Sequence, residues 1–173
     1  MLLLFHPKIM EDDLITLVIE RAQQKIPSPY VRWGIGEDGF DCSGFWYSIF
    51  SQLWVVFPSR FTAAMFSSHS RKISKNQIRR GDFMFWDQKP WSKKHNPIYH
   101  IEMVVSAPFM RYGKSYVKTL GSSSSKGIFD IKGKRLEQSG VGYRIREITQ
   151  YRHFWRPPYY LQLAECKKQE MWS

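Results

Sequence analysis

Cys42 lies in a segment whose composition suits a nucleophile. The run Phe-Asp-Cys-Ser-Gly at residues 40–44 follows a glycine-rich loop, and residues 42–56 are apolar almost all round, which predicts a buried helix. A cysteine in the first turn of a helix meets the positive end of the helix dipole, which favours the reactive thiolate. The backbone N–H groups of that turn are also suited to bind a developing oxyanion. The polar, glycine-rich flanks therefore favour a catalytic thiol over the small core residue that a lone cysteine more often is.

A nucleophilic cysteine needs a base, and His100 is the strongest candidate among the five histidines. Residues 98–105 alternate in a way that predicts a strand, with His100 and Glu102 on one face and Ile101 and Met103 on the other. A strand fixes the direction of a side chain, whereas His69 and His95 fall in polar stretches. Considered without Cys42, His100 is interpreted equally well as a packed strand histidine.

The remaining pattern predicts helices first and an antiparallel sheet afterwards. We expect a further helix over residues 12–25, strands over 82–86, 98–105, 115–120 and 141–148, a long turn over 106–114 and a loop over the Gly-Ser-rich residues 121–127. This order predicts an α+β fold. The length of 173 residues suits one domain over 1–173, with 1–28 as an N-terminal helical extension and 160–173 as a tail that frays.

Four blocks of sequence, in order along the chain, resemble the motifs of NlpC/P60 cysteine peptidases. They are Pro29-Tyr30 with Trp33-Gly34 and the run at 40–44, Arg80-Gly81-Asp82, the strand from His100, and Gly121-Ser122-Ser123-Ser124. The resemblance implies a papain-like domain in which a central helix carrying the nucleophile packs on an antiparallel sheet. It also implies hydrolysis, without metal or cofactor, of the bond between a γ-D-glutamyl residue and a diamino acid in peptidoglycan stem peptides.

The resemblance also implies roles for the matched residues. Cys42 would be the nucleophile and His100 the base, and Tyr30 would help to hold the oxyanion. The substrate-binding residues would be Tyr30, Trp33, Asp41 and Ser43. Asp41 is suited to pair with a free ammonium of the substrate, and equally suited to cap the helix. If it pairs, stem peptides with a free L-alanine amine should be preferred over peptides still attached to sugar.

The chain departs from the family pattern in three places. One extra residue lies within residues 30–33, and the turn after the histidine strand is long. The family places a polar third residue, often histidine, where this chain has Thr119 or Leu120. Leucine cannot orient an imidazole and threonine does so weakly, so Glu102, on the same strand face as His100, is a further candidate for that role.

Charge and the N-terminus bear on partners and location. The net charge of +11 predicts attraction to anions, and we expect no requirement for nucleic acid. Neither a signal peptide nor a membrane span is evident, which predicts a cytoplasmic protein, or one of the cell envelope if an export route or upstream start was missed. Two other functions remain open: an amidase or acyltransferase with the same Cys–His pair, and a non-catalytic basic binding module. The sequence leaves the oligomeric state undetermined.

Overall fold

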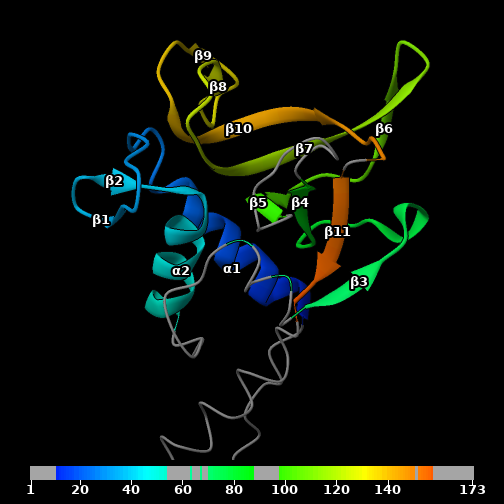
Figure 1. The fold of residues 1–173 in the computed structure, drawn as a ribbon, viewed down its shortest axis with the longest axis horizontal. Helices are drawn as coiled ribbons and strands as arrows, with labels where there is room; N and C mark the ends of the chain where they lie inside the picture. The colour runs from blue at the N-terminus through cyan, green and yellow to red at the C-terminus, as the bar shows by residue number, and fades with distance from the viewer. Residues whose placement is uncertain are drawn as a thin grey trace, which may run out of the picture.

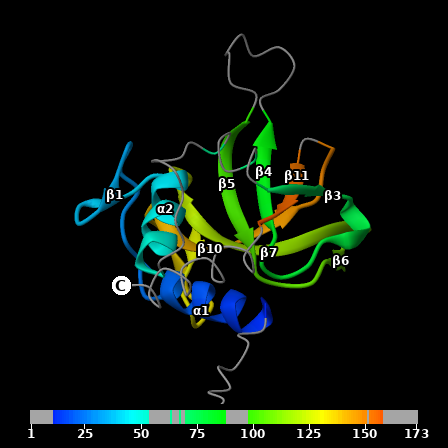
Figure 2. The same ribbon diagram turned by 90° about the horizontal axis from the view of Figure 1, so that it is seen from below.

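In the described part of the chain, helices cover one face of a large antiparallel sheet (Figures 1 and 2). The computed structural model describes residues 11–53, 63, 67, 70–87, 98–150 and 152–157. The helices are α1 (Glu11–Gln23) and α2 (Cys42–Gln52), with a 3₁₀ turn at Lys75–Gln77. The strands are β1 (Ile35–Gly36), β2 (Gly39–Phe40), β3 (Arg71–Ile73), β4 (Phe83–Asp87), β5 (Ile98–Val104), β6 (Phe109–Arg111), β7 (Lys114–Ser123), β8 (Ile128–Phe129), β9 (Arg135–Leu136), β10 (Gly140–Glu147) and β11 (Arg152–Arg156).

The described strands of the large sheet run in the order β3-β11-β4-β5-β7-β10-β8-β9, with β6 paired to β7, and every pairing is antiparallel. Strand β5 pairs with β4 from Ile98 to Met103, but with β7 only at Met103 and Val104. Strands β5 and β7 therefore separate at the beginning of β5. This opening lies where Cys42, at the start of α2, meets the sheet.

The core lies on both faces of the sheet. On the helical face, Trp46 of α2 packs edge-on against Phe83 of β4 at 5.2 Å between ring centroids, and Ile101 and Met103 of β5 join the same cluster. The opposite face carries a second cluster with Trp86 and Val104. The predicted alternation is thereby confirmed for Ile101, Met103, Val104 and Val105. It is wrong for Ile98, which packs against the helical-face cluster where the register of β4 and β5 shifts between Trp86 and Asp87.

Most predicted elements are confirmed, and two are wrong in part. The helices begin within a residue of the predicted positions, and α2 is described as far as its C-cap Leu53, so 54–56 fall outside the described residues. Gly121–Ser123 were predicted as loop but extend β7, because their backbones pair with Gly140–Gly142 of β10. The composition of a Gly-Ser run favours a loop, but the hydrogen bonds of the ladder outweigh that local preference. Part of the predicted turn at 106–114 is β6, and β11 was not predicted.

The N-terminal segment belongs to the same core as the sheet. The buried face of α1 (Leu14, Ile15, Val18, Ile19 and Ala22) lies in one cluster with the buried residues of α2. No described helix is long and apolar enough to cross a membrane. The predicted tail at 160–173, including Cys166, lies outside the described residues.

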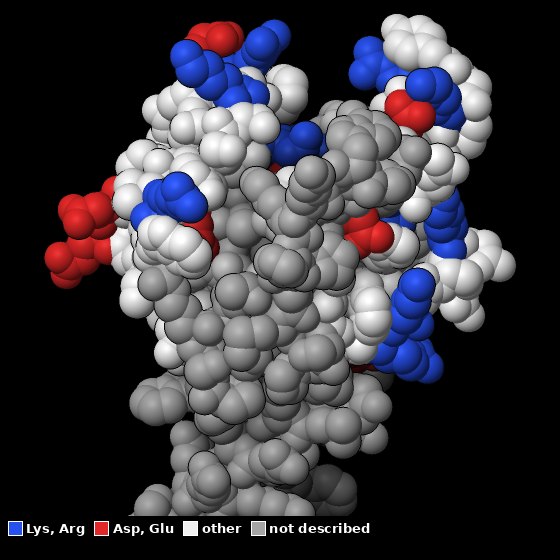
Figure 3. All heavy atoms as spheres, in the orientation of Figure 1, with Lys and Arg blue, Asp and Glu red and all other residues white. Residues whose placement is uncertain are grey.

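Basic side chains dominate parts of the described surface. Figure 3 shows Lys and Arg gathered on the two projections at the top of the view, which carry β8–β9 and the β6–β7 hairpin in Figure 1. Acidic side chains are fewer there, in keeping with the net charge of +11. Such a surface raises the local concentration of anionic ligands.

Candidate active site

Helix α2 begins at Cys42 because Asp41 caps it. Asp41 has extended backbone angles (φ −82°, ψ −178°), and its Oδ1 accepts a hydrogen bond from the Gly44 amide at 2.6 Å. Gly44 has to be small, since a Cβ there would lie 2.2 Å from the carbonyl oxygen of Gly34. The cap predicted for Asp41 is therefore present, and it fixes Cys42 in the first turn.

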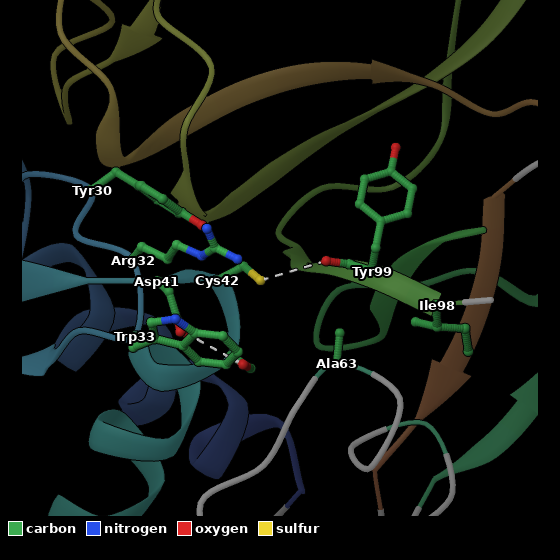
Figure 4. Close-up of a pocket in the computed structure, with 9 residues that line it drawn as sticks. Tyr30, Arg32, Trp33, Asp41, Cys42, Ala63, Ile98 and Tyr99 are labelled. Atoms are coloured by element: carbon green, nitrogen blue, oxygen red, sulfur yellow. Dashed lines mark hydrogen bonds between the residues drawn. The ribbon is translucent and has the colours of Figure 1, made fainter. Parts of the chain in front are cut away.

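Cys42 lies in a pocket formed by the loop before α2 and the beginning of β5 (Figure 4). The lining residues are Tyr30, Arg32, Trp33, Asp41, Cys42, Ser43, Ala63, Ile98 and Tyr99. The Cys42 thiol donates to the carbonyl oxygen of Tyr99, with 3.9 Å between Sγ and oxygen. All four residues predicted to bind substrate thus line one pocket with the predicted nucleophile.

The Cys42 thiol is not activated in the way the sequence suggests. Burial, and next to it the charge of Asp41, raise the pKa of Cys42 to about 11, although backbone groups of Ile101, Ser43 and Cys42 itself act in the opposite direction. The backbone groups at the start of the helix thus favour thiolate, as the sequence predicts, but burial and the charge of Asp41 outweigh them.

Removing the charge of Asp41 should make Cys42 more reactive. Asp41→Asn retains a side-chain oxygen that can cap α2, and without the negative charge the thiolate is less disfavoured. We expect the pH midpoint of Cys42 alkylation by iodoacetamide to fall by roughly one pH unit. The alkylation is measured by mass spectrometry of the peptide that contains Cys42. Asp38→Asn, which removes the same charge from an exposed position, is the control. Equal shifts of the alkylation midpoint in the two variants would contradict the conclusion that the charge of Asp41 raises the pKa of Cys42.

His100 is held by Glu102 on the sheet face opposite to α2. The His100 Nε2 and Glu102 Oε1 atoms are 3.0 Å apart, and the His100 ring packs edge-on against Trp86 at 4.8 Å. Thr119 donates to the other carboxylate oxygen, Oε2, at 2.6 Å. Among the candidates for a third residue, Glu102 contacts His100, Thr119 contacts Glu102, and Leu120 lies in the core of the helical face.

Two arginines of β10 lie against the Glu102 carboxylate. Arg146 donates to Oε2 at 2.9 Å through Nε and to Oε1 at 2.5 Å through a terminal nitrogen, and an Arg144 nitrogen lies 3.9 Å from Oε1. Burial by itself would raise the pKa of Glu102, which is fully buried, but Arg146 and His100 hold it well below its usual range. Burial also lowers the pKa of Arg144 to about 10.

The small-residue run at the end of β7 makes room for this carboxylate. A Cβ on Gly121 would lie 2.9 Å from Cγ of Glu102. Ser122, next along the strand, donates to the carbonyl of Phe40 at 2.7 Å and so ties β7 to the strand that leads into Cys42. The run therefore joins the two halves of the site.

The predicted site residues form two groups that meet at the beginning of β5. The pocket group surrounds Cys42, and the other group is the hydrogen-bonded set of His100, Glu102 and Thr119. Within the described ranges, the Cys42 thiol is hydrogen-bonded to the carbonyl of Tyr99 and the His100 imidazole to Glu102. Cys42 and His100 therefore bind separate partners rather than each other. The nucleophile thus lies beside the backbone of the residue that precedes the predicted base.

The sequence analysis missed Arg32 and Arg146. The extra residue in the loop at 30–33 was noticed, and it is this loop that brings Arg32 into the pocket. Arg146 sits in the alternating strand predicted at 141–148, where a cation on the same face as a buried carboxylate is a signal for an ion pair. No group of three His, Cys, Asp or Glu suited to a metal ion occurs in the described parts of the chain.

A helix that begins at Cys42 and packs on an antiparallel sheet, with a carboxylate-held histidine on the inner strand β5, defines a papain-like α+β domain. Residues 28–161 match the NlpC/P60 family, and the chain belongs to that family. This confirms the predicted fold and the resemblance.

Individual relatives agree with this membership. Over 70 residues the chain is 34% identical to a Listeria seeligeri protein named "Probable endopeptidase p60"; the match covers 40% of this chain but only 13% of that protein. An NLP/P60 family protein similar to lipoprotein from Staphylococcus aureus has the same fold (TM-score 0.59, 15% identity, 85% of this chain and 42% of that one). So does the NlpC/p60 domain of the peptidoglycan hydrolase SagA (TM-score 0.53, 21% identity, 82% and 97%).

Proposed function

We propose that this chain hydrolyses an amide bond in peptidoglycan stem peptides, between a γ-D-glutamyl residue and a diamino acid, through a thioester on Cys42. The observation that carries the proposal is the position of Cys42. It lies in the first turn of α2, in a pocket beside the strand whose His100 is bound by the buried Glu102.

The family supports the class of substrate. Two of the relatives are named an endopeptidase and a peptidoglycan hydrolase, which favours a cell-wall peptide over other amides. A substrate in the wall favours action at the cell envelope, and the comparisons lend no support to the cytoplasmic expectation. Because the chain spans 13% of the Listeria protein and 42% of the Staphylococcus chain, the activities of those whole proteins remain proposals here.

His100 is suited to remove the thiol proton. The ionised Glu102 accepts a hydrogen bond from Nε2–H, and the neutral ring then offers Nδ1 as its basic nitrogen. Since the pKa of Cys42 is about 11, the thiol keeps its proton near neutral pH and must transfer it to Nδ1 as the sulfur attacks. The thiol is bonded to the Tyr99 carbonyl and the imidazole to Glu102 on the other face of the sheet, so this transfer requires the two side chains to approach each other when the substrate binds.

The carbonyl oxygen of the substrate gains negative charge when sulfur attacks. Backbone N–H groups at the start of α2 are placed to bind it, together with the phenol of Tyr30. Burial, followed by the nearby Cys42 and Asp41, raises the pKa of Tyr30, which keeps this phenol protonated as a donor. His100 then returns its proton to the leaving amine, and water hydrolyses the thioester to restore the thiol.

We assign the amino end of the substrate to the side of the pocket formed by Trp33, Asp41 and Ser43. The Asp41 carboxylate caps α2 and also lines the pocket, so an ammonium of the substrate would share it with the Gly44 amide. The two interpretations that the sequence left open for Asp41 are therefore compatible.

A second function, that of a binding module without catalysis, is favoured by one observation: the Cys42 thiol contacts the Tyr99 carbonyl and the His100 imidazole contacts Glu102, rather than each other. The test is incubation of the protein with L-Ala-γ-D-Glu-diaminopimelate, with and without an added amine acceptor, followed by mass spectrometry. Hydrolysis releases diaminopimelate and L-Ala-D-Glu. A product joined to the acceptor would instead identify an acyltransferase, and binding of an intact peptide would identify a binding module.

A further inference from the structure

The loop between α1 and α2 places a cation in the pocket beside Cys42. Arg32 lines the same pocket as Cys42 and Asp41, and Figure 4 shows its guanidinium between the Tyr30 hydroxyl and the Cys42 sulfur. Arg32 also opposes the rise in the pKa of Tyr30 that burial, Cys42 and Asp41 cause. A positive charge thus lies beside the proposed oxyanion donor, in the same pocket as Cys42.

The Arg32 side chain is supported by an aromatic ring. Its guanidinium carbon lies 5.6 Å from the ring centroid of Trp33, which adopts a left-handed backbone conformation (φ 66°). That conformation is uncommon for a residue other than glycine. The ion pairs among the described residues are made by basic side chains other than Arg32. Asp41, the carboxylate in the pocket, uses its Oδ1 atom to cap α2. Arg32 is therefore positioned to pair with a carboxylate brought by a ligand.

The proposed scissile bond has such a carboxylate close by. In a γ-glutamyl linkage the attacked carbonyl belongs to the glutamate side chain, so the α-carboxylate of that residue stays free. Three carbon atoms separate the carboxylate carbon from the attacked carbonyl carbon. A guanidinium binds a carboxylate through two parallel hydrogen bonds, which a carboxamide cannot accept in the same way.

We propose that Arg32 binds the α-carboxylate of the γ-D-glutamyl residue and selects stem peptides that carry this acid over those in which it is an α-amide. The assignment rests on the proposed function for the identity of the ligand. It adds a residue that determines specificity. Arg32 comes from the loop at 30–33 and is separate from Cys42, His100 and Glu102.

The test compares kcat/KM for L-Ala-γ-D-Glu-diaminopimelate with that for the same peptide bearing an α-carboxamide. A charge-assisted pair predicts a preference for the acid of roughly 10- to 100-fold. Arg32→Gln should remove most of the preference by slowing cleavage of the acid while changing the amide little, and Arg32→Lys should restore part of it. Arg135→Gln, which removes the same charge from an exposed position, should retain the full preference. Equal kcat/KM values for acid and amide in the unmodified protein would overturn the proposal.

A binding experiment separates this inference from the proposed reaction. The Cys42→Ala protein should bind the acid more tightly than the amide by a similar factor, and Arg32→Gln in that background should abolish the difference. If the unmodified protein cleaves neither peptide but this binding preference is found, hydrolysis is wrong and the role of Arg32 stands. If the peptides are cleaved but bind and react without preference, the role of Arg32 is wrong and hydrolysis stands.

Discussion

Glu102→Gln is expected to destabilise the fold by about 3–5 kcal/mol and to impair catalysis as well. Glutamine keeps the size of the side chain but leaves Arg146 and Arg144 without the carboxylate that they face in a buried site, and removal of one partner of such a pair has a cost of that order. The same change removes the anion that binds Nε2 of His100. Denaturant unfolding measures the first effect and kcat the second.

The pH dependence gives a second check on Glu102. Its pKa is lower in the folded than in the unfolded protein, so its stabilising contribution is complete above the unfolded value of about 4.3 and is lost as pH falls through the folded value. The difference in stability between unmodified protein and Glu102→Gln should therefore stay constant at neutral pH and shrink only in strong acid.

Two variants serve as controls for Glu102→Gln. Glu147→Gln removes a carboxylate at the end of β10 whose partner, Lys114, is exposed, and it should change stability little. Thr119→Val removes a hydrogen bond to Glu102 but leaves the charge, so it should affect activity less than Glu102→Gln. A larger loss in Thr119→Val would make Thr119 the residue that positions His100.

His100→Ala is expected to lower kcat by about 10²- to 10⁴-fold, the usual contribution of general acid–base catalysis. Without the imidazole the buried Cys42 thiol has no acceptor for its proton and the leaving amine has no donor. His153→Ala is the matched control, since His153 lies on β11 and pairs with Asp87 rather than with Glu102. Retained activity in His100→Ala, or an equal loss in His153→Ala, would assign the base elsewhere.

The sequence predicted the Cys42 helix and the His100 strand because both depend on local patterns. A glycine-rich loop before an apolar helix places the cysteine, and alternation over residues 98–105 separates His100 from Ile101. It also indicated that Glu102 shares the face of His100. What it could not provide is the Arg146–Glu102 pair, which depends on β10 lying beside β7 and β7 beside β5.

Two further features arise only from the packed structure. The pKa of Cys42 depends on how deeply the thiol is buried and on its distance to Asp41, and a motif shows neither. The position of Arg32 depends on the path of a loop in which Trp33 takes a left-handed conformation. Residues 121–123 show the reverse case, since a strong local signal for a loop was outweighed by pairing with β10.

The central claim is that Cys42 carries out the cleavage of the γ-D-glutamyl bond. The most direct measurement is the release of diaminopimelate from L-Ala-γ-D-Glu-diaminopimelate by the unmodified protein and by Cys42→Ala, followed by mass spectrometry, with thermal unfolding to verify that both are folded. We expect the unmodified protein to yield diaminopimelate and L-Ala-D-Glu, and the folded Cys42→Ala variant to yield neither. Release of diaminopimelate by Cys42→Ala at the rate of the unmodified protein would contradict the account.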